Sequence, residues 1–293
     1  MGSGAAGRPV VARARGRGPR PSPRHHVAVG IALMLAPSLL GWARSLDDAQ
    51  IIQEMSSVAS DGDAEGKEAC IRQAEAYNAS LGGYEGSDVG QVLPYEEQLR
   101  YGGMDEMCWV EAPSVGIRCP VYHGTGDDAL AAGVGHLEGT SLPVGGRSSH
   151  CVLTAHSGLA TSRGFDDIRG LGTGDRVVLH VLDRAYAYEV TGSEVVLPDE
   201  ASSLSIERGQ DLLTLVTCTP YGVNDHRLLV HCRRCVGEPS VDGAGGRTDT
   251  TFVPMGVRVP AAAIAAVAGA CVVAYVPGRE RREPRRRRGG GRR

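Results

Sequence analysis

The pattern of short apolar runs and turn-forming residues between residues 108 and 235 is the feature that most constrains the fold. Short apolar or alternating runs follow one another, and glycine, proline or aspartate bounds each of them. Runs of this length and spacing predict the short strands of a closed or sandwiched β domain. The predicted strands are Ile117–Tyr122, Cys151–Ala155, Arg176–Leu182, Tyr186–Leu197, Leu212–Thr217 and Arg227–His231. Residues 127–133 and 165–171 are predicted as short helices within this domain.

The segments around this domain differ from it in composition. Residues 45–81 are rich in Ala, Glu and Gln and predict two helical stretches, broken around Asp61–Gly66. A loop at 82–105 follows, so an N-terminal region at 45–105 precedes the β domain at 106–235. We interpret the outer segments as a basic tail at 1–26, a linker of Gly, Ser and Thr at 236–252 and a second basic tail at 278–293.

Two apolar segments lie next to the basic tails. Residues 27–43 carry no charge, and their length fits either a cleaved signal peptide or a signal anchor. A second uncharged run, Val259–Val276, precedes an arginine cluster and predicts a transmembrane helix within 253–277, with a buried Ala-rich helix as the alternative. Because Lys and Arg favour the cytoplasmic side, we expect both tails in the cytoplasm if the first segment is not cleaved. The β domain is then outside the cell membrane.

Acidic residues dominate the region between the two apolar segments. Residues 45–250 hold 32 Asp and Glu against 14 Lys and Arg. Such a surface repels phosphate groups, so nucleic acid is excluded as a partner of this region. The whole chain is 42% hydrophobic and 22% charged, which is typical of a folded domain rather than a disordered chain.

The cysteines are distributed unevenly. Cys271 lies in the second apolar segment, and seven others lie in the acidic region. An odd number predicts one working thiol, and an extracellular location permits disulfides among the other six. Those six are Cys70, Cys108, Cys119, Cys151, Cys232 and Cys235. The last two form a C-X-X-C motif without a second pair at zinc-site spacing, so a disulfide or free thiols are expected there rather than a metal.

The segment Thr214–Arg227 carries the sharpest chemical signal. Cys218 ends a β-type run directly before a turn, where its thiolate can reach a substrate as a nucleophile. Arg227 begins the next run, and its guanidinium suits the stabilisation of an oxyanion if the two runs are neighbouring strands. His156, at the end of another run, is the best candidate for the general acid or base.

Other polar residues have weaker claims to a chemical role. His226 is the rival base, although alternation along a strand turns it away from the Arg227 side. His123, His136 and His150 are expected to be structural hydrogen-bonding residues. The acidic pairs Asp127–Asp128 and Asp166–Asp167 are expected in solvated turns, with calcium binding as the less favoured alternative.

Four blocks of this sequence resemble one known family. Thr214–Cys218 reads TLVTC, which is similar to the Thr-Leu-X-Thr-Cys signature of sortases, the cysteine transpeptidases of Gram-positive surfaces. The continuation of this block, Thr219–Val230, is similar to the class C, pilin-assembling branch, and so are Pro120–Thr125 and Gly133–Gly146. The fourth block, Val152–Leu159, resembles the segment that bears the family histidine. The resemblance covers roughly residues 105–234.

This resemblance implies a mainly β fold, an eight-stranded sortase barrel with short helices. It assigns the nucleophile to Cys218, the acid or base to His156 and the transition-state stabiliser to Arg227, with a weaker substrate-binding role for Thr217. The implied substrates are pilins or surface proteins with a Leu-Pro-X-Thr-Gly type signal, cleaved between Thr and Gly through a thioacyl intermediate. The implied acceptor is a pilin lysine amine. No metal and no organic cofactor is implied.

The sequence also departs from the family pattern. The histidine block usually reads Gly-His-Arg-Gly, whereas residues 155–158 here read Ala-His-Ser-Gly, and Asp225 stands where Thr is usual. Residues 82–105 lack the Asp-Pro-aromatic motif of a class C lid, and Leu93–Glu96 is the nearest piece. We therefore expect that this loop obstructs the site weakly or not at all. Two alternatives stay open: a wall-anchoring sortase that uses a peptidoglycan precursor, and a catalytically silent assembly scaffold.

Overall fold

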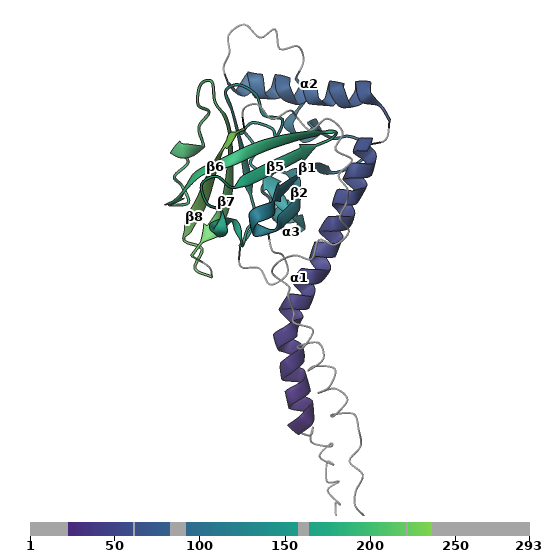
Figure 1. Ribbon diagram of the computed structural model, residues 1–293, viewed down its shortest axis with the longest axis vertical. Coiled ribbons are helices and arrows are strands. Elements are labelled where there is room, and N and C mark those ends of the chain that lie inside the picture. The colour runs from purple at the N-terminus through teal and green to yellow at the C-terminus, as the bar shows by residue number, and fades with distance from the viewer. Residues whose placement is uncertain (1–22, 61, 83–91, 158–163, 221, 236–293) are drawn as a thin grey trace, which may run out of the picture. The chain divides into compact units, whose positions relative to one another are not determined.

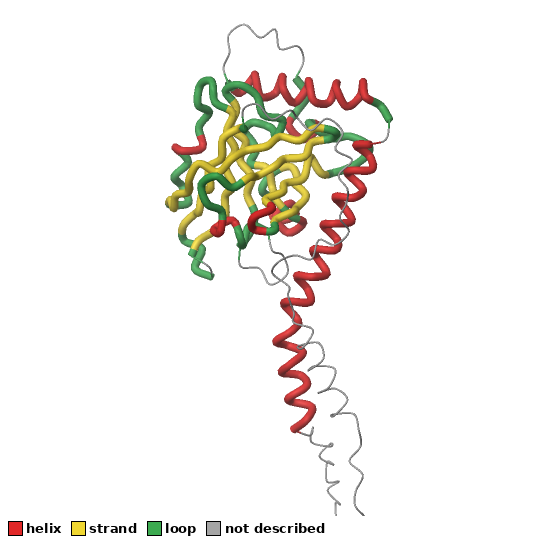
Figure 2. The backbone as a smooth tube through the Cα atoms, viewed as in Figure 1, coloured by secondary structure: helices red, strands yellow, loops and turns green. Residues whose placement is uncertain are grey.

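The computed structural model describes residues 23–60, 62–82, 92–157, 164–220 and 222–235 of the chain (Figure 1). Its centre is a closed barrel of strands in the order β1-β2-β3-β4-β7-β8-β6-β5 (Figure 2). The strands are β1 (Glu106–Ala112), β2 (Ile117–His123), β3 (Val134–His136), β4 (Ser149–Thr154), β5 (Arg176–Val181), β6 (Arg184–Val196), β7 (Asp211–Thr219) and β8 (His226–Arg234). The expectation of an eight-stranded, mainly β barrel is confirmed.

Most neighbouring strands are antiparallel, but β2 pairs with β3 and β4 pairs with β7 in parallel. Parallel neighbours need long connections, and the chain between β4 and β7 includes β5 and β6. The barrel therefore brings β4 and β7 together although they are far apart in sequence.

Side-chain alternation places the core inside the barrel. On β7, Leu213 and Leu215 are fully buried and belong to the central hydrophobic cluster. Successive side chains of a strand point to opposite faces, so Thr214, Val216 and Cys218 lie on the outer face of the wall. The wall thus has an apolar inner face and a partly polar outer face.

The helices follow the predicted order. The helices and single turns are α1 (Pro23–Ser60), α2 (Ala64–Leu81), η1 (Tyr95–Glu97), η2 (Pro113–Val115), α3 (Asp127–Ala132), η3 (Ile168–Gly170) and η4 (Ser202–Leu204). The predicted break between the first two helices is confirmed, because the Asp63 side chain caps α2 by accepting a hydrogen bond from the amide of Gly66 at 3.0 Å.

Helix α2 lies across one end of the barrel (Figure 1). The Asn78 side chain accepts a hydrogen bond from the Leu142 amide at 2.6 Å and donates to the Gly145 carbonyl at 3.2 Å. Arg184 of β6 forms an ion pair with Glu68 of the helix. These contacts attach the helix to both sides of the barrel rim.

The disulfides that the sequence permits among the outer cysteines are not formed, and Cys232 and Cys235 are both thiols, which is one of the two expected states. Cys108, Cys119, Cys151 and Cys232 are buried thiols, and Cys70 is a half-buried one. The strand register places Val121 opposite Cys108 and Val110 opposite Cys119, so these two thiols fill apolar positions instead of facing one another. Burial raises the pKa of Cys119 and Cys232 to about 12, which keeps both protonated. They pack as small hydrophobic residues.

The apolar segment at 27–43 lies within α1. Among the helices of the described residues, none is both long and apolar enough to cross a membrane, so the predicted anchor is not supported. The run is interrupted by Gly30, Pro37 and Gly41, which lower its apolar character. The second apolar segment, Val259–Val276, lies outside the described residues.

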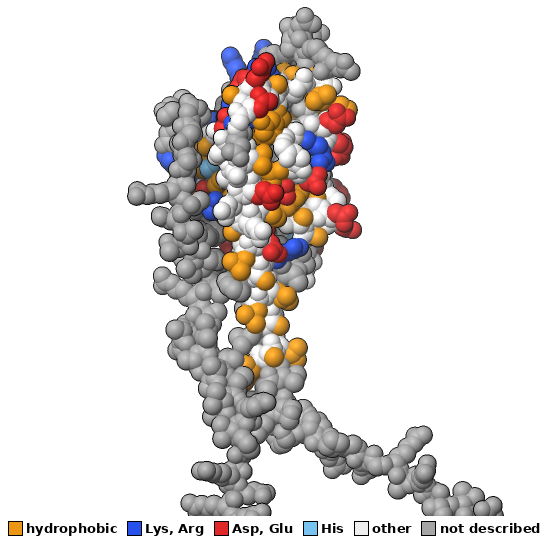
Figure 3. Space-filling view, turned by 90° about the vertical axis from the view of Figure 1, so that its right-hand side faces the viewer, with side chains coloured by type: hydrophobic (Ala, Val, Ile, Leu, Met, Phe, Trp, Pro, Cys, Tyr) orange, Lys and Arg blue, Asp and Glu red, His pale blue; other side chains and the backbone are white. Residues whose placement is uncertain are grey.

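The surface carries the acidic excess seen in the sequence. In the face turned to the viewer in Figure 3, acidic side chains surround a strip of hydrophobic ones, and basic side chains are fewer. This surface agrees with the excess of acids over bases between residues 45 and 250.

Candidate active site

Cys218 and Arg227 lie directly opposite each other on two neighbouring strands. The antiparallel pairing of β7 with β8 places Cys218 against Arg227 and Thr219 against His226. Directly opposed side chains share one face of a sheet, with Cβ atoms about 5 Å apart. The thiol and the guanidinium therefore start from adjacent positions on the outer face of the barrel.

His156 follows the end of β4 and lies on the side of Cys218 opposite to Arg227. Strand β4 runs parallel to β7, and the pairing extends past its end, since the Ala155 amide donates to the Val216 carbonyl at 3.2 Å. The Ser157 hydroxyl then donates to the Cys218 carbonyl at 2.7 Å. His156 lies between these two attached residues. The structure thus brings all three predicted catalytic residues to the ends of three adjacent strands.

The turn after Cys218 holds the arginine. The guanidinium of Arg227 donates through Nη1 to the carbonyls of Asn224 at 3.2 Å and His226 at 3.1 Å. Asn224 has a φ of 61°, a left-handed conformation that asparagine adopts more readily than most residues. Since one nitrogen makes both contacts, the rest of the planar group stays available to a substrate.

Thr217 and Ser157 attach the segment around His156 to β7. The Thr217 hydroxyl is buried and donates to the Ala155 carbonyl at 2.8 Å. Its predicted contact with substrate stays a prediction. Ser157 was not among the predicted site residues, because only the pairing of β4 with β7 shows that its hydroxyl reaches Cys218.

His226, the rival base, has a different partner. Its Nδ1 lies 2.8 Å from Asp225 Oδ1, and both side chains are exposed. The hydrogen bond from His226 lowers the pKa of Asp225. The register puts His226 opposite Thr219, one step away from the pair formed by Cys218 and Arg227. Alternation therefore directs it to the other face, as the sequence predicted.

The remaining predicted histidines are hydrogen-bonding residues, as expected. His136 is fully buried between Tyr95 and the Ser141 carbonyl, and burial lowers its pKa to about 4. His123 contacts the Gln98 carbonyl and His150 contacts Thr214. Within the described residues, no group of three or more His, Cys, Asp or Glu is arranged to hold a metal ion.

One residue of the lid-like piece Leu93–Glu96 lies in the core, and the other three are exposed. Tyr95 is buried, and its hydroxyl lies 3.0 Å from His136 Nδ1 and accepts a hydrogen bond from the Gly124 amide at 2.9 Å. Residues 92–105 thus contribute an anchor for η1 rather than a plug over Cys218. Residues 83–91 lie outside the described part of the chain.

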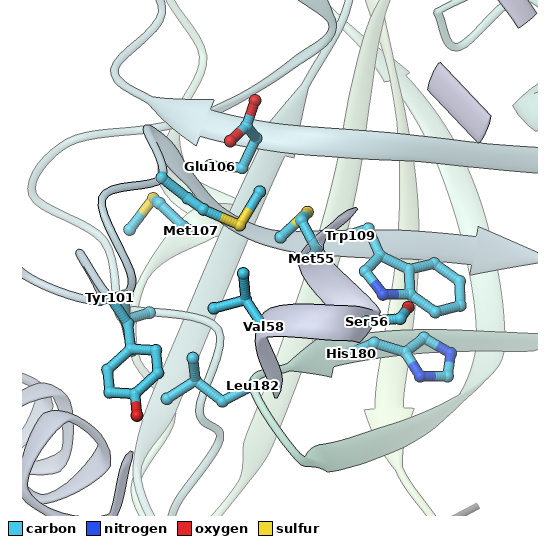
Figure 4. Close-up of a pocket in the computed structure, with 11 residues that line it drawn as sticks. Met55, Ser56, Val58, Tyr101, Glu106, Met107, Trp109, His180 and Leu182 are labelled. Carbon is cyan, nitrogen blue, oxygen red and sulfur yellow. The ribbon is translucent and has the colours of Figure 1, made fainter. Parts of the chain in front are cut away.

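A small pocket lies on another part of the barrel, between α1 and the strands β1 and β5 (Figure 4). Trp109 and His180 stack there with ring centroids 3.6 Å apart, and His180 Nε2 lies 3.3 Å from Glu111 Oε2. The hydrogen bond from His180 lowers the pKa of Glu111. The pocket encloses about 30 Å³, which is room for a water molecule or two but not for a peptide.

Comparison with known proteins agrees with this geometry. A model of the sortase domain matches residues 110–235. Sortase C1 from Streptococcus agalactiae is 36% identical with a TM-score of 0.59, and the match covers 64% of this chain and 100% of that one. Clostridium perfringens sortase C is 40% identical with a TM-score of 0.57, and the match covers 64% and 98% of the two chains.

Curated relatives are more distant. Sortase A of Bacillus anthracis is 29% identical over 121 residues, which are 41% of this chain and 56% of that protein. Sortase A of Streptococcus agalactiae is 28% identical over 42% of this chain and 50% of that protein. The chain therefore matches about half the length of these curated relatives. The barrel, the solved structures matched almost over their full length and the domain match together show that this chain belongs to the sortase family of cysteine transpeptidases.

Proposed function

We propose that this protein is a class C sortase that joins pilin subunits. In the proposed reaction, the Cys218 thiolate attacks the Thr carbonyl carbon of a Leu-Pro-X-Thr-Gly type signal. The bond between Thr and Gly breaks, and His156 donates a proton to the departing Gly amine. A lysine amine of a second pilin then attacks the thioester, gives its proton to His156 and releases Cys218 as a thiolate.

The placement of Cys218 between Arg227 and the segment that carries His156 is the observation that carries this proposal. The Arg227 guanidinium is proposed to stabilise the oxyanion that develops on the attacked carbonyl, since a fixed donor in a partly dry site stabilises charge strongly. The turn carbonyls of Asn224 and His226 orient it for this task.

The choice of class C over a wall-anchoring sortase depends on the relatives. Sortase C structures reach 36–41% identity, a sortase A structure from Corynebacterium diphtheriae reaches 34%, and the curated sortase A proteins reach 28–29%. One class C relative is described with the C-terminal cell wall sorting motif, and another with insights into pilin substrate specificity. These descriptions support the proposed substrate class. We place the reaction at the outer surface of the cell membrane, where exported pilins carry their signals.

A mass-labelling experiment tests the proposal. The full chain is incubated with a sorting-signal peptide, and we expect an acyl adduct on Cys218 that corresponds to the peptide ending at Thr. Cys218→Ala should abolish the adduct, and Cys70→Ala, which removes a half-buried thiol elsewhere, should leave it unchanged. Arg227→Lys should reduce adduct formation by about 100-fold or more, because a point charge does not replace the planar donors.

The acceptor is tested in a second step. A peptide with a pilin-type lysine should release the adduct as a new isopeptide product faster than a peptidoglycan-type amine does. Faster release by the wall-type amine would favour the wall-anchoring alternative. A folded protein that forms no adduct with several signal peptides would favour the catalytically silent scaffold.

A further inference from the structure

A continuous line of polar side chains crosses the outer face of four adjacent strands, on the same face as Cys218. Glu194 Oε1 on β6 lies 3.1 Å from His231 Nε2 on β8, and His231 Nδ1 lies 3.0 Å from Thr214 Oγ1 on β7. The same Thr214 oxygen lies 2.8 Å from His150 Nε2 on β4. His150 Nδ1 ends the line 3.0 Å from the Ser205 carbonyl. We call these four side chains and the Ser205 carbonyl the cross-strand chain.

The last member of the cross-strand chain belongs to the loop 197–210, which joins β6 to β7. This loop leaves β6 after Val196, the residue opposite Arg227, and enters β7 at Asp211, the end of that strand far from Cys218. It therefore runs along the outside of the barrel wall, from the end that carries Arg227 to the opposite end. His150, which is 2% exposed, holds the loop near its middle through Ser205.

The cross-strand chain requires a definite number of polar hydrogens. Its four contacts need four hydrogens, one for each pair of facing atoms. Two neutral imidazoles and one hydroxyl supply three, because each carries a single polar hydrogen. Both ends of the line, the Ser205 carbonyl and the Glu194 carboxylate, only accept. The cross-strand chain therefore makes all four hydrogen bonds only when it carries a fourth proton, in addition to the three that the neutral imidazoles and the hydroxyl supply.

The surroundings indicate where the extra proton is held. Burial lowers the pKa of His150, the hydrogen bond to the Ser205 carbonyl opposes this, and the charge of His231 lowers it further while Glu207 of the loop raises it. The Ser203 hydroxyl of the loop and then the His231 imidazole lower the pKa of Glu194, so the carboxylate stays charged. Buried His150 is therefore the neutral histidine, and in the arrangement with four hydrogen bonds His231 donates through Nε2 to Glu194 and through Nδ1 to Thr214. The Thr214 hydroxyl then donates to His150, whose Nδ1 donates to Ser205.

We propose that His150, Thr214, His231 and Glu194 are positioning residues that fix the loop 197–210 beside Cys218 and Arg227 while the fourth proton is present. When that proton leaves, one of the four hydrogen bonds must be lost and the hold on the loop weakens. Histidine changes charge between about pH 5 and 8, so the loop is held better at the acidic end of that range. The effect of the loop on turnover rests on the proposed function, whereas the loop itself can be observed without substrate.

Amide hydrogen exchange of the loop 197–210 in the full chain tests this proposal. Protection is expressed relative to the intrinsic exchange rate at each pH, so that only the opening of the loop is compared. In the wild-type protein we expect protection to fall by about fivefold between about pH 5.5 and 8.5, the change that the loss of one hydrogen bond brings. A constant level of protection in the wild-type protein would overturn the proposal.

Two substitutions are expected to remove the pH dependence in opposite directions. Glu194→Gln supplies an amide hydrogen to His231, so that two neutral histidines complete all four bonds and protection stays high at every pH. Thr214→Val breaks the line at its centre, and protection stays low at every pH. Glu194 is exposed, so its variant is expected to fold even if the Thr214 variant does not. A wild-type pH profile in Glu194→Gln would contradict the proton count.

A matched control and a substrate measurement complete the test. His180→Gln alters another pair of histidine and glutamate, on β5 and β1, and should leave the loop profile unchanged. For the wild-type protein acting on a sorting-signal peptide, KM should rise by the same factor of about five toward alkaline pH. Glu194→Gln should remove this rise. If no peptide is turned over, the proposed function fails while the exchange result still decides the role of the cross-strand chain.

Discussion

At the scale of single residues, the candidate site depends on contacts between side chains and backbone carbonyls. Ser157 stands where related sortases usually carry arginine, and its hydroxyl donates to the carbonyl of Cys218 itself. This contact joins the histidine segment to the nucleophile without a second charged group. Arg227 is then the cation in register with the thiol.

Replacing Ser157 by alanine tests the importance of this contact. Ser157→Ala should lower the free energy of unfolding by about 1 kcal/mol, the net value of one hydrogen bond. It should slow acylation of Cys218 by about tenfold or more, because the imidazole is no longer held in place. Urea unfolding and single-turnover acylation measure the two effects. Ser80→Ala removes a hydrogen bond of the same length on α2, and equal slowing in both variants would refute the positioning role.

The sequence predicted the three candidate catalytic residues but not the residues that position them. Cys218, His156 and Arg227 stand out because each belongs to a local block that resembles a family signature. The contact of Ser157 depends on pairing between strands that are distant in the chain, which no local pattern contains. The cross-strand chain is hidden for the same reason, since its four side chains come from four strands.

At the scale of elements, the sequence missed two strands for identifiable reasons. In β1, an irregularity between Glu106 and Cys108 shifts the register and breaks the alternation on which strand prediction depends. In β3, Gly135 is central, and a Cβ there would lie 2.4 Å from the Gly124 carbonyl oxygen. The close approach of two backbones requires glycine at that position, and sequence patterns assign such glycines to loops. The six other strands were predicted within a few residues.

The element η1 provides a test of the expectation that residues 82–105 obstruct the site weakly. Tyr95→Ala should lower the free energy of unfolding by about 3–5 kcal/mol, because it empties a buried aromatic position. Alkylation of Cys218 in the folded fraction should keep its wild-type rate. A lid residue would show the reverse, with accelerated alkylation and little loss of stability. Leu93→Ala, a partly exposed residue of the same segment, is the matched control.

At the scale of the whole molecule, buried His136 makes stability depend on pH. Burial lowers its pKa from 6.5 to about 4 in the folded protein. Between these values the unfolded chain binds a proton that the folded chain does not, so stability falls as pH falls. The loss should reach roughly 3 kcal/mol by pH 4. Urea unfolding at neutral pH and near pH 4 should show this fall, and His136→Gln should make it smaller by that amount. An equal fall in both proteins would contradict the assignment.

The parallel pairing of β4 with β7 has a consequence for the newly made polypeptide. The two strands become neighbours only after β5 and β6 have found places elsewhere in the sheet, and Arg227 arrives with β8, the last strand in chain order. Contacts between distant segments form late and slowly. A chain interrupted during translation before β8 therefore has a cysteine but no assembled site. Such fragments are expected to be unable to form an acyl adduct with a sorting-signal peptide.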